Sequence, residues 1–243
     1  MKTWLFTTFI MVATILLGCT PISKEDVLLK LSDHAKYIET YVIENELSLH
    51  TKAANSYKEQ LGQLTIKGEI NLKESKGFIE MYEDYSSGTY ETFAYFNGTD
   101  YAVNWYGDGW STDMGAVANL HTYFLTDYHL LIQAIELIEM NDDAVLIDME
   151  DYYSLTLDAP TTQPFESFAR SLGITLNEEL ISDMSVTLEI EQHTFFLTKI
   201  TFMVREEIDG IQHETVIQIT YSQINEPLQI KKPFQIEAQE ISL

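Results

Sequence analysis

The sequence predicts an α+β protein in which a large curved antiparallel sheet, an incomplete β-barrel, is covered on one face by helices. Segments that alternate apolar and polar residues are numerous, and short turn sequences separate them. Segments with helical spacing are few and stand apart from the strands, which disfavours a doubly wound parallel sheet. Apolar residues make up 45% of the chain and aromatic residues 12%. We therefore expect residues 24–243 to form a single domain with a substantial core.

The N-terminus has the features of a lipoprotein signal peptide over residues 1–18. Lys2 gives a basic start, and the stretch from Trp4 to Leu17 is uncharged and mostly apolar. It is shorter than the roughly 20 apolar residues that a membrane-spanning helix needs. The run Leu16-Leu17-Gly18-Cys19 resembles the lipobox of bacterial lipoproteins, in which the cysteine receives a diacylglyceryl thioether and becomes the first mature residue. The alternatives are an ordinary secretory signal followed by a free thiol, or a short N-terminal anchor.

Lipidation of Cys19 has consequences for location. Cys19 is the only cysteine, so the chain has no internal disulfide and its thiol is available for lipid. Residues 19–23 then form a short tether that holds the folded body close to the bilayer. Each buried methylene of the lipid contributes about 0.8 kcal/mol to membrane binding. We expect a protein anchored by lipid to the extracytoplasmic face of the cell membrane.

The charge of the chain excludes one class of partner. Its net charge is −24, and removal of the signal peptide, which contains Lys2, changes this to −25. Nucleic-acid binding requires clustered Lys and Arg, so no nucleic-acid partner is expected. An acidic body is repelled by anionic headgroups, and the lipid must therefore provide the attachment to the membrane.

The first expected element is a helix over residues 24–41. Ser23 and Asp26 have the spacing of an N-terminal cap. Apolar residues recur at helical spacing at Val27, Leu28, Leu31, Ala35 and Ile38.

A meander of about five strands is expected over residues 46–113. The alternating segments are residues 47–51, 64–72, 77–83 and 89–96. Their turns are Ser86-Ser87-Gly88, Asn97-Gly98 and Gly107-Asp108-Gly109, of which Asn97-Gly98 is the strongest hairpin signal.

The second half of the chain repeats the pattern. Helical spacing returns over residues 116–140, with Leu120, Phe124, Leu131, Ile135 and Ile138 on one side, and Asn141-Asp142-Asp143 ends it. Strands are expected at 144–148 and 152–157, then a loop between Pro160 and Pro164 and a short helix at 165–172. The last strands are expected at 184–190, 195–204, 214–221 and 234–241, with Asp209-Gly210 as a tight turn.

Two segments resemble parts of a known group of proteins. Residues 95–110, YFNGTDYAVNWYGDGW, are similar to the central hairpin of small Gram-positive lipoproteins with LolA-like or LppX-like architecture. Residues 216–233, VIQITYSQINEPLQIKKP, resemble the last long strand, connector and terminal strand of that group. The resemblance implies a half-barrel around a hydrophobic cavity, and in relatives this cavity carries lipids or lipoprotein acyl chains. It brings no catalytic residues.

Aromatic residues are the candidates for lining such a cavity. The expected ligand-binding residues are Phe93, Tyr95, Tyr101, Trp105, Trp110 and Phe124. The alternative is that they are strand formers that make cross-strand pairs, in a protein whose interior is filled.

Enzyme chemistry has little support, and we expect neither a catalytic residue nor a cofactor. The histidines are scattered, and His121 and His129 lack the spacing of a zinc site. The acidic runs around Asp142 and Asp148 do not have EF-hand spacing. No nucleophile elbow or phosphate-binding loop is present. Two hypotheses remain: a lipoprotein that binds a lipid or other hydrophobic ligand for transport or sensing, or a structural or protein-interaction lipoprotein without a small ligand.

Overall fold

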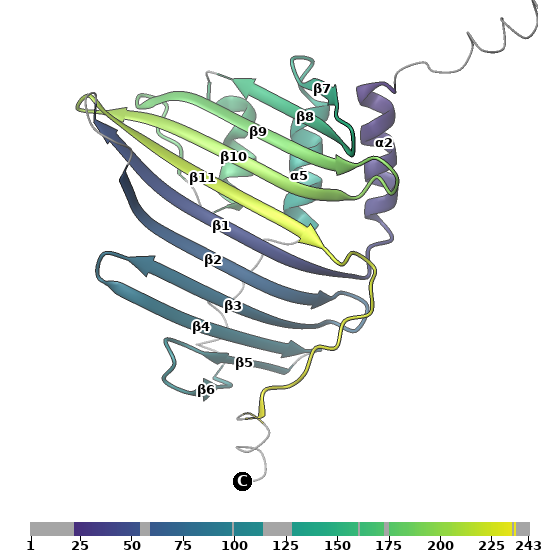
Figure 1. Cartoon of the computed structure of the whole chain (residues 1–243), viewed down its shortest axis with the longest axis vertical. Helices are drawn as coiled ribbons and strands as arrows, with labels where there is room; N and C mark the ends of the chain where they lie inside the picture. Colours follow the sequence, from purple (N-terminus) through teal and green to yellow (C-terminus); the bar gives the residue numbers. More distant parts are fainter. Residues whose placement is uncertain are drawn as a thin grey trace, which may run out of the picture.

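A single antiparallel sheet dominates the computed structural model of the chain (Figure 1). The structure describes residues 22–53, 59–98, 100–113, 128–159, 161–172, 175–234 and 236. The sheet has 11 strands in the order β6-β5-β4-β3-β2-β1-β11-β10-β9-β8-β7. It is curved and does not close, because β6 and β7 lie at opposite edges. The predicted fold class is confirmed.

The first half of the sheet is the predicted meander. Its strands are β1 Thr40–Ala53, β2 Glu59–Asn71, β3 Lys76–Tyr85, β4 Gly88–Asn97, β5 Asp100–Asn104 and β6 Trp110–Ser111. The Asn97-Gly98 hairpin connects β4 to β5, and Gly98 has a φ of 64° that glycine adopts without strain.

The second half of the sheet is built from the C-terminal part of the chain. Its strands are β7 Val145–Asp148, β8 Tyr152–Ala159, β9 Ile181–Glu191, β10 Leu197–Ile208 and β11 Ile211–Ser222. Asp209 and Gly210 form the predicted turn between β10 and β11. The two halves meet where β11 pairs with β1, with Ile43 opposite Tyr221 and Leu47 opposite Ile217.

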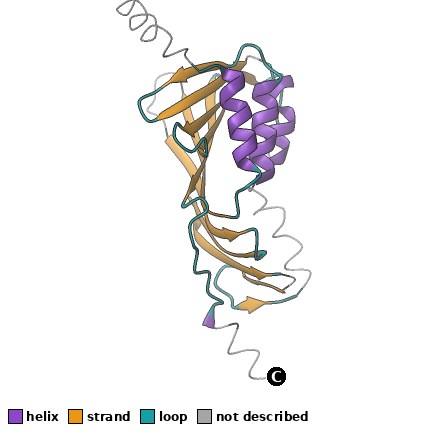
Figure 2. Cartoon of the chain, turned by 90° about the vertical axis from the view of Figure 1, so that its right-hand side faces the viewer, coloured by secondary structure: helices purple, strands orange, loops and turns teal. Residues whose placement is uncertain are grey.

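Helices lie together over the β7–β11 half of the sheet (Figure 2). They are α2 Lys24–Ala35, α5 Tyr128–Glu139 and α6 Glu166–Ser171, and the 3₁₀ turn η1 Gln163–Phe165 precedes α6. The cap of α2 is as predicted, because the Asp26 amide donates to Ser23 Oγ at 3.1 Å. Helix α5 contacts α2, α6 and β8. None of the described helices is long and apolar enough to cross a bilayer.

Two predicted boundaries are corrected. The first helix ends at Ala35 rather than at residue 41, and Thr40 already begins β1. The run Ile38 to Ile43 is rich in β-branched residues, which favour strands, and Tyr41 is buried on the sheet. At the other end of the chain, the expected strand at 234–241 is not found where it is described, since Phe234 and Ile236 have helical backbone.

Other predictions fall partly outside the described residues. Of the helix expected at 116–140, the structure describes Tyr128–Glu139, in which Leu131, Ile135 and Ile138 are buried as predicted. Leu120 and Phe124 lie outside the described residues, as do Cys19 and residues 1–18, the predicted signal peptide.

The two faces of the sheet differ in character. The face toward the helices, here called the inner face, carries the main core, with Leu155, Leu188 and Ile200 in successive strands. The opposite, outer face of β9–β11 is polar. There Arg205 pairs with Asp183 at 2.8 Å and with Glu214 at 3.0 Å, linking three neighbouring strands. Burial of the inner face is therefore what stabilises the curved sheet.

Candidate ligand-binding face

The inner face of β1–β5 is the candidate site. It continues the apolar surface of the main core away from the half that α2, α5 and α6 cover. Along each strand, every second residue belongs to this face, and residues directly opposite each other in paired strands lie on the same face. The buried apolar members are Ile43, Ile66, Ile70, Ile79, Met81, Ala94 and Val103. These side chains are at most 8% exposed, and helices α2, α5 and α6 lie over the other half of the sheet (Figures 1 and 2).

One row of this face contains polar residues. Asn45 of β1 lies opposite Ile66 of β2, Ile66 opposite Met81 of β3, and Met81 opposite Thr92 of β4. Asn45 is 7% exposed and Thr92 is 1% exposed. Two deeply buried polar side chains thus lie at either end of a short apolar stretch.

Neither polar side chain is fully satisfied. The oxygens Asn45 Oδ1 and Thr92 Oγ1 are buried and have no hydrogen-bond partner among the described residues. Buried polar atoms are paired in the great majority of cases, and an unpaired one costs about 1–3 kcal/mol. Such atoms mark positions where a ligand can supply the missing partner.

The predicted aromatic residues do not form one cluster. Tyr101 and Trp105 lie on the inner side, where they pack against the main core, and the ring of Tyr101 stacks on that of Phe96 at 6.2 Å. Phe124, which was also predicted to bind the ligand, is outside the described residues.

The other predicted aromatic residues lie on the outer face. Tyr95 and Trp110 belong to a separate small core with Ala102 and Ile230, and Phe93 stacks on Phe78 at 6.4 Å. The chain that follows β11 passes over this side, bringing Leu228 and Ile230 onto it. We call Phe78, Tyr95, Ala102, Trp110, Leu228, Ile230 and Ile236 the outer patch. Only Tyr101 and Trp105 of the described predicted residues are therefore placed to meet a ligand on the inner face.

Asn45 and Thr92 were missed by the sequence reasoning. The alternation along β4 places Thr92 in phase with Ala94 and Phe96, so a polar residue at an apolar position was visible in the sequence. Asn45 precedes residue 47, where the first strand is expected to begin, so the predicted alternation does not include it.

Basic side chains lie away from the inner face of this half. The basic residues of β2 and β3 are Lys67 and Lys76, and both are in phase with outer residues. Lys67 Nζ contacts Glu44 at 2.8 Å, which raises the pKa of Lys67. Glu83, a carboxylate, lies in phase with the inner residues near the end of β3. No group of three potential metal ligands is present in the described parts of the chain.

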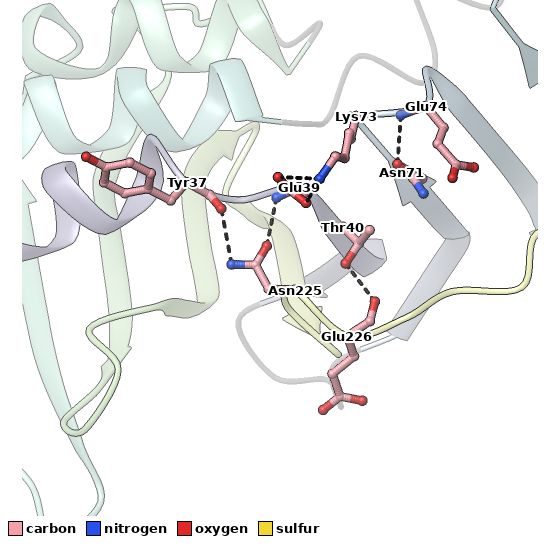
Figure 3. A network of polar contacts seen from close by, with 8 residues as sticks. All are labelled: Tyr37, Glu39, Thr40, Asn71, Lys73, Glu74, Asn225 and Glu226. Carbon is pink, nitrogen blue, oxygen red and sulfur yellow. Dashed lines mark hydrogen bonds and ion pairs between the residues drawn. The ribbon is translucent and has the colours of Figure 1, made fainter.

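A network of polar contacts holds the segment that follows β11 and leads to the outer patch (Figure 3). Asn225 follows β11 and has a left-handed φ of 60°. Its side chain accepts from the Glu39 amide at 2.7 Å and donates to the Tyr37 carbonyl at 3.2 Å. Thr40 Oγ1 donates to the Glu226 carbonyl at 2.7 Å. These bonds tie the start of the C-terminal segment to the connection between α2 and β1.

Comparison with known proteins assigns no family to the chain. No protein-family model matches the chain, and no curated protein matches it in sequence. The crystal structure of LprF from Mycobacterium bovis is similar with a TM-score of 0.48 and 10% identity, over 86% of this chain and 98% of LprF. A LolA superfamily protein from Nitrosomonas europaea is similar with a TM-score of 0.25 and 10% identity, over 88% of this chain and 100% of that protein.

A third similar structure is MucB in complex with periplasmic MucA. Its TM-score is 0.31 at 10% identity, over 88% of this chain and 61% of MucB. At these TM-scores the likeness assigns neither a family nor a ligand to this chain.

Proposed function

We propose that this protein is a membrane-anchored extracytoplasmic lipoprotein that binds a lipid or another hydrophobic ligand on the inner face of β1–β5. The observation that carries the proposal is the apolar inner surface of this half, which includes Ile66, Met81 and Val103 and extends away from the described helices. An acyl chain placed there gains about 0.8 kcal/mol for each methylene removed from water. Tyr101 and Trp105 flank this surface on the side of β5.

The binding function is tested with a soluble form that starts at Thr20. Every described element begins at or after Ile22, so this form retains all of them. Native mass spectrometry of the purified protein is expected to show species heavier by the mass of a lipid, which organic extraction removes. Protein that is free of lipid and fails to bind apolar fluorescent probes would instead support the structural or protein-interaction function.

Anchoring is tested separately at Cys19. The variant Cys19→Ser is expected to lose labelling by a fatty-acid analogue, because serine does not form the thioether, and to leave the membrane fraction. The measurement is metabolic labelling followed by fractionation of wild-type and variant cells. A variant that stays in the membrane fraction at the wild-type level contradicts the anchor.

A further inference from the structure

We propose that the ligand is an uncharged lipid with a hydrogen-bond donor, a hydroxyl or an amide N–H, and that Asn45 and Thr92 are two separate acceptors for such a donor. This inference rests on the proposed function and adds the chemical class of the ligand. It starts from the buried side-chain oxygens Asn45 Oδ1 and Thr92 Oγ1 of the inner face, which have no hydrogen-bond partner in the described structure.

The chemistry of the oxygens specifies a donor. Asn45 Oδ1 is an amide oxygen and accepts hydrogen bonds only, and the Thr92 hydroxyl accepts or donates. A ligand that offers only ester or ether oxygens leaves Asn45 Oδ1 without a partner. A hydroxyl or amide N–H satisfies either residue, and in an environment of low polarity such a bond distinguishes strongly between ligands that have it and ligands that lack it.

The charges around the row disfavour an anionic ligand. In the described structure, no basic residue is in phase with the inner residues of β1–β6. Between Asn45 and Thr92, the row contains only the apolar residues Ile66 and Met81. A phosphate or carboxylate would be buried there without a cation, which is costly. Glu83 adds a negative charge on the same face.

The spacing of the two residues defines how a ligand lies on them. Asn45 and Thr92 are three strands apart, about 14 Å along the sheet at the usual strand spacing. A single small headgroup does not reach both. Each oxygen is therefore a separate polar contact on a surface where Ile66 and Met81 provide the apolar contact between them.

The test compares probes that share one acyl chain. Monooleoylglycerol carries hydroxyl donors, methyl oleate has none, and oleate is charged. The soluble form starting at Thr20 is titrated with each probe by displacement of an apolar fluorophore. We expect it to bind monooleoylglycerol at least about 5-fold more tightly than methyl oleate, the effect of one net hydrogen bond. Oleate is expected to bind more weakly than both.

Variants of Asn45 and Thr92 test whether these residues cause the preference for monooleoylglycerol. Thr92→Val and Asn45→Leu replace each side chain by an apolar one of similar shape and remove the oxygens, so each is expected to affect methyl oleate binding less than monooleoylglycerol binding. At least one of them is expected to lower the affinity for monooleoylglycerol about 5-fold. Thr201→Val is the matched control, because Thr201 lies on the outer face between Gln218 and Thr187.

The possible outcomes separate the two proposals. An unchanged preference in the Asn45→Leu/Thr92→Val double variant overturns the assignment of the donor site, and so does an equal loss for both neutral probes. Binding of methyl oleate as tight as that of monooleoylglycerol to the wild type also overturns it, while the proposed lipid binding stands. If no probe binds to the wild type, the proposed function itself fails.

Discussion

Gly77 lies on the inner face of β3 directly beneath the ring of Phe96. A Cβ atom at Gly77 would come within 2.3 Å of Phe96 Cε1 and Cζ. The two residues face each other across the β3–β4 pair, and the ring covers the space that the glycine leaves. Close packing at this end of the candidate face therefore depends on one missing methyl group.

The substitution Gly77→Ala is expected to lower the free energy of unfolding by about 1–3 kcal/mol, because the ring must move out of a packed position. Urea denaturation of the soluble form measures this. The matched double variant adds Phe96→Leu, which removes the obstructing ring, and its loss is expected to be smaller than the sum of the two single losses. Strict additivity would contradict the proposed contact.

Asn45 and Thr92 show the limit of sequence reasoning at this scale. Thr92 interrupts an apolar phase, which the sequence displays, but the lack of a partner for its oxygen depends on which strands surround it. The pairing of β1 with β11, which places Ile219 beside Asn45, joins residues that are far apart in the chain. Alternation of residue types gives no information on such a neighbour.

The C-terminal segment packs against the sheet although most of its described residues have no regular secondary structure. Residues 223–233 leave β11 and run across the ends of β1–β4, and Ile230 is buried in the outer patch with Tyr95. The sequence predicted a strand at 234–241 from its alternation. Instead, the Ile236 amide donates to the Pro233 carbonyl at 3.0 Å, which is a bond of a helical turn and not of a strand ladder.

Ile230→Asn is expected to loosen the C-terminal segment, because it places a polar side chain in the outer patch. The emission of Trp110 is then expected to shift to longer wavelength, while that of Trp105 stays unchanged. Trp105→Phe and Trp110→Phe backgrounds separate the two signals, since these are the tryptophans that remain after Thr20. Gln229→Ala changes an exposed neighbour and serves as the control. A shift in the emission of Trp105 alone would contradict the packing of Ile230 with Trp110 in the outer patch.

The two tryptophans also explain which part of the site was predictable. Phe93 and Tyr95 share one phase of β4 and Phe96 has the other, so their separation onto two faces follows from the sequence. Trp105 and Trp110 flank a turn with Gly107 and Gly109 at positive φ, and phase is not carried across such a turn. Their assignment to opposite sides required the three-dimensional structure.

At the scale of the whole molecule, the described ion pairs between strands lie on the outer face of the sheet. The outer face of the sheet carries ion pairs such as Lys67–Glu44 and Lys199–Glu189, and the inner face carries the core. The net charge of −24 gives the body no means of binding an anionic membrane by its own surface. The proposed attachment through Cys19 and the proposed ligand binding on the inner face therefore concern separate parts of the chain.

The predicted fold class and most of the strands agree with the structure because alternation and turn sequences are local signals. The Asn97-Gly98 and Asp209-Gly210 turns were found where expected. The curvature of the sheet and the grouping of the helices over the β7–β11 half depend on packing between distant segments. Which half of the sheet the described helices cover was therefore beyond the reach of sequence patterns.

Quenching of tryptophan by a brominated lipid tests the central claim most directly. Trp105 lies on the inner side and Trp110 on the outer side. A monoacylglycerol with a dibrominated acyl chain is added to the Trp110→Phe and Trp105→Phe forms, and fluorescence is recorded. We expect saturable quenching of Trp105 in the first form and little quenching of Trp110 in the second. Quenching of Trp110 alone, or of both residues equally, would contradict binding on the inner face.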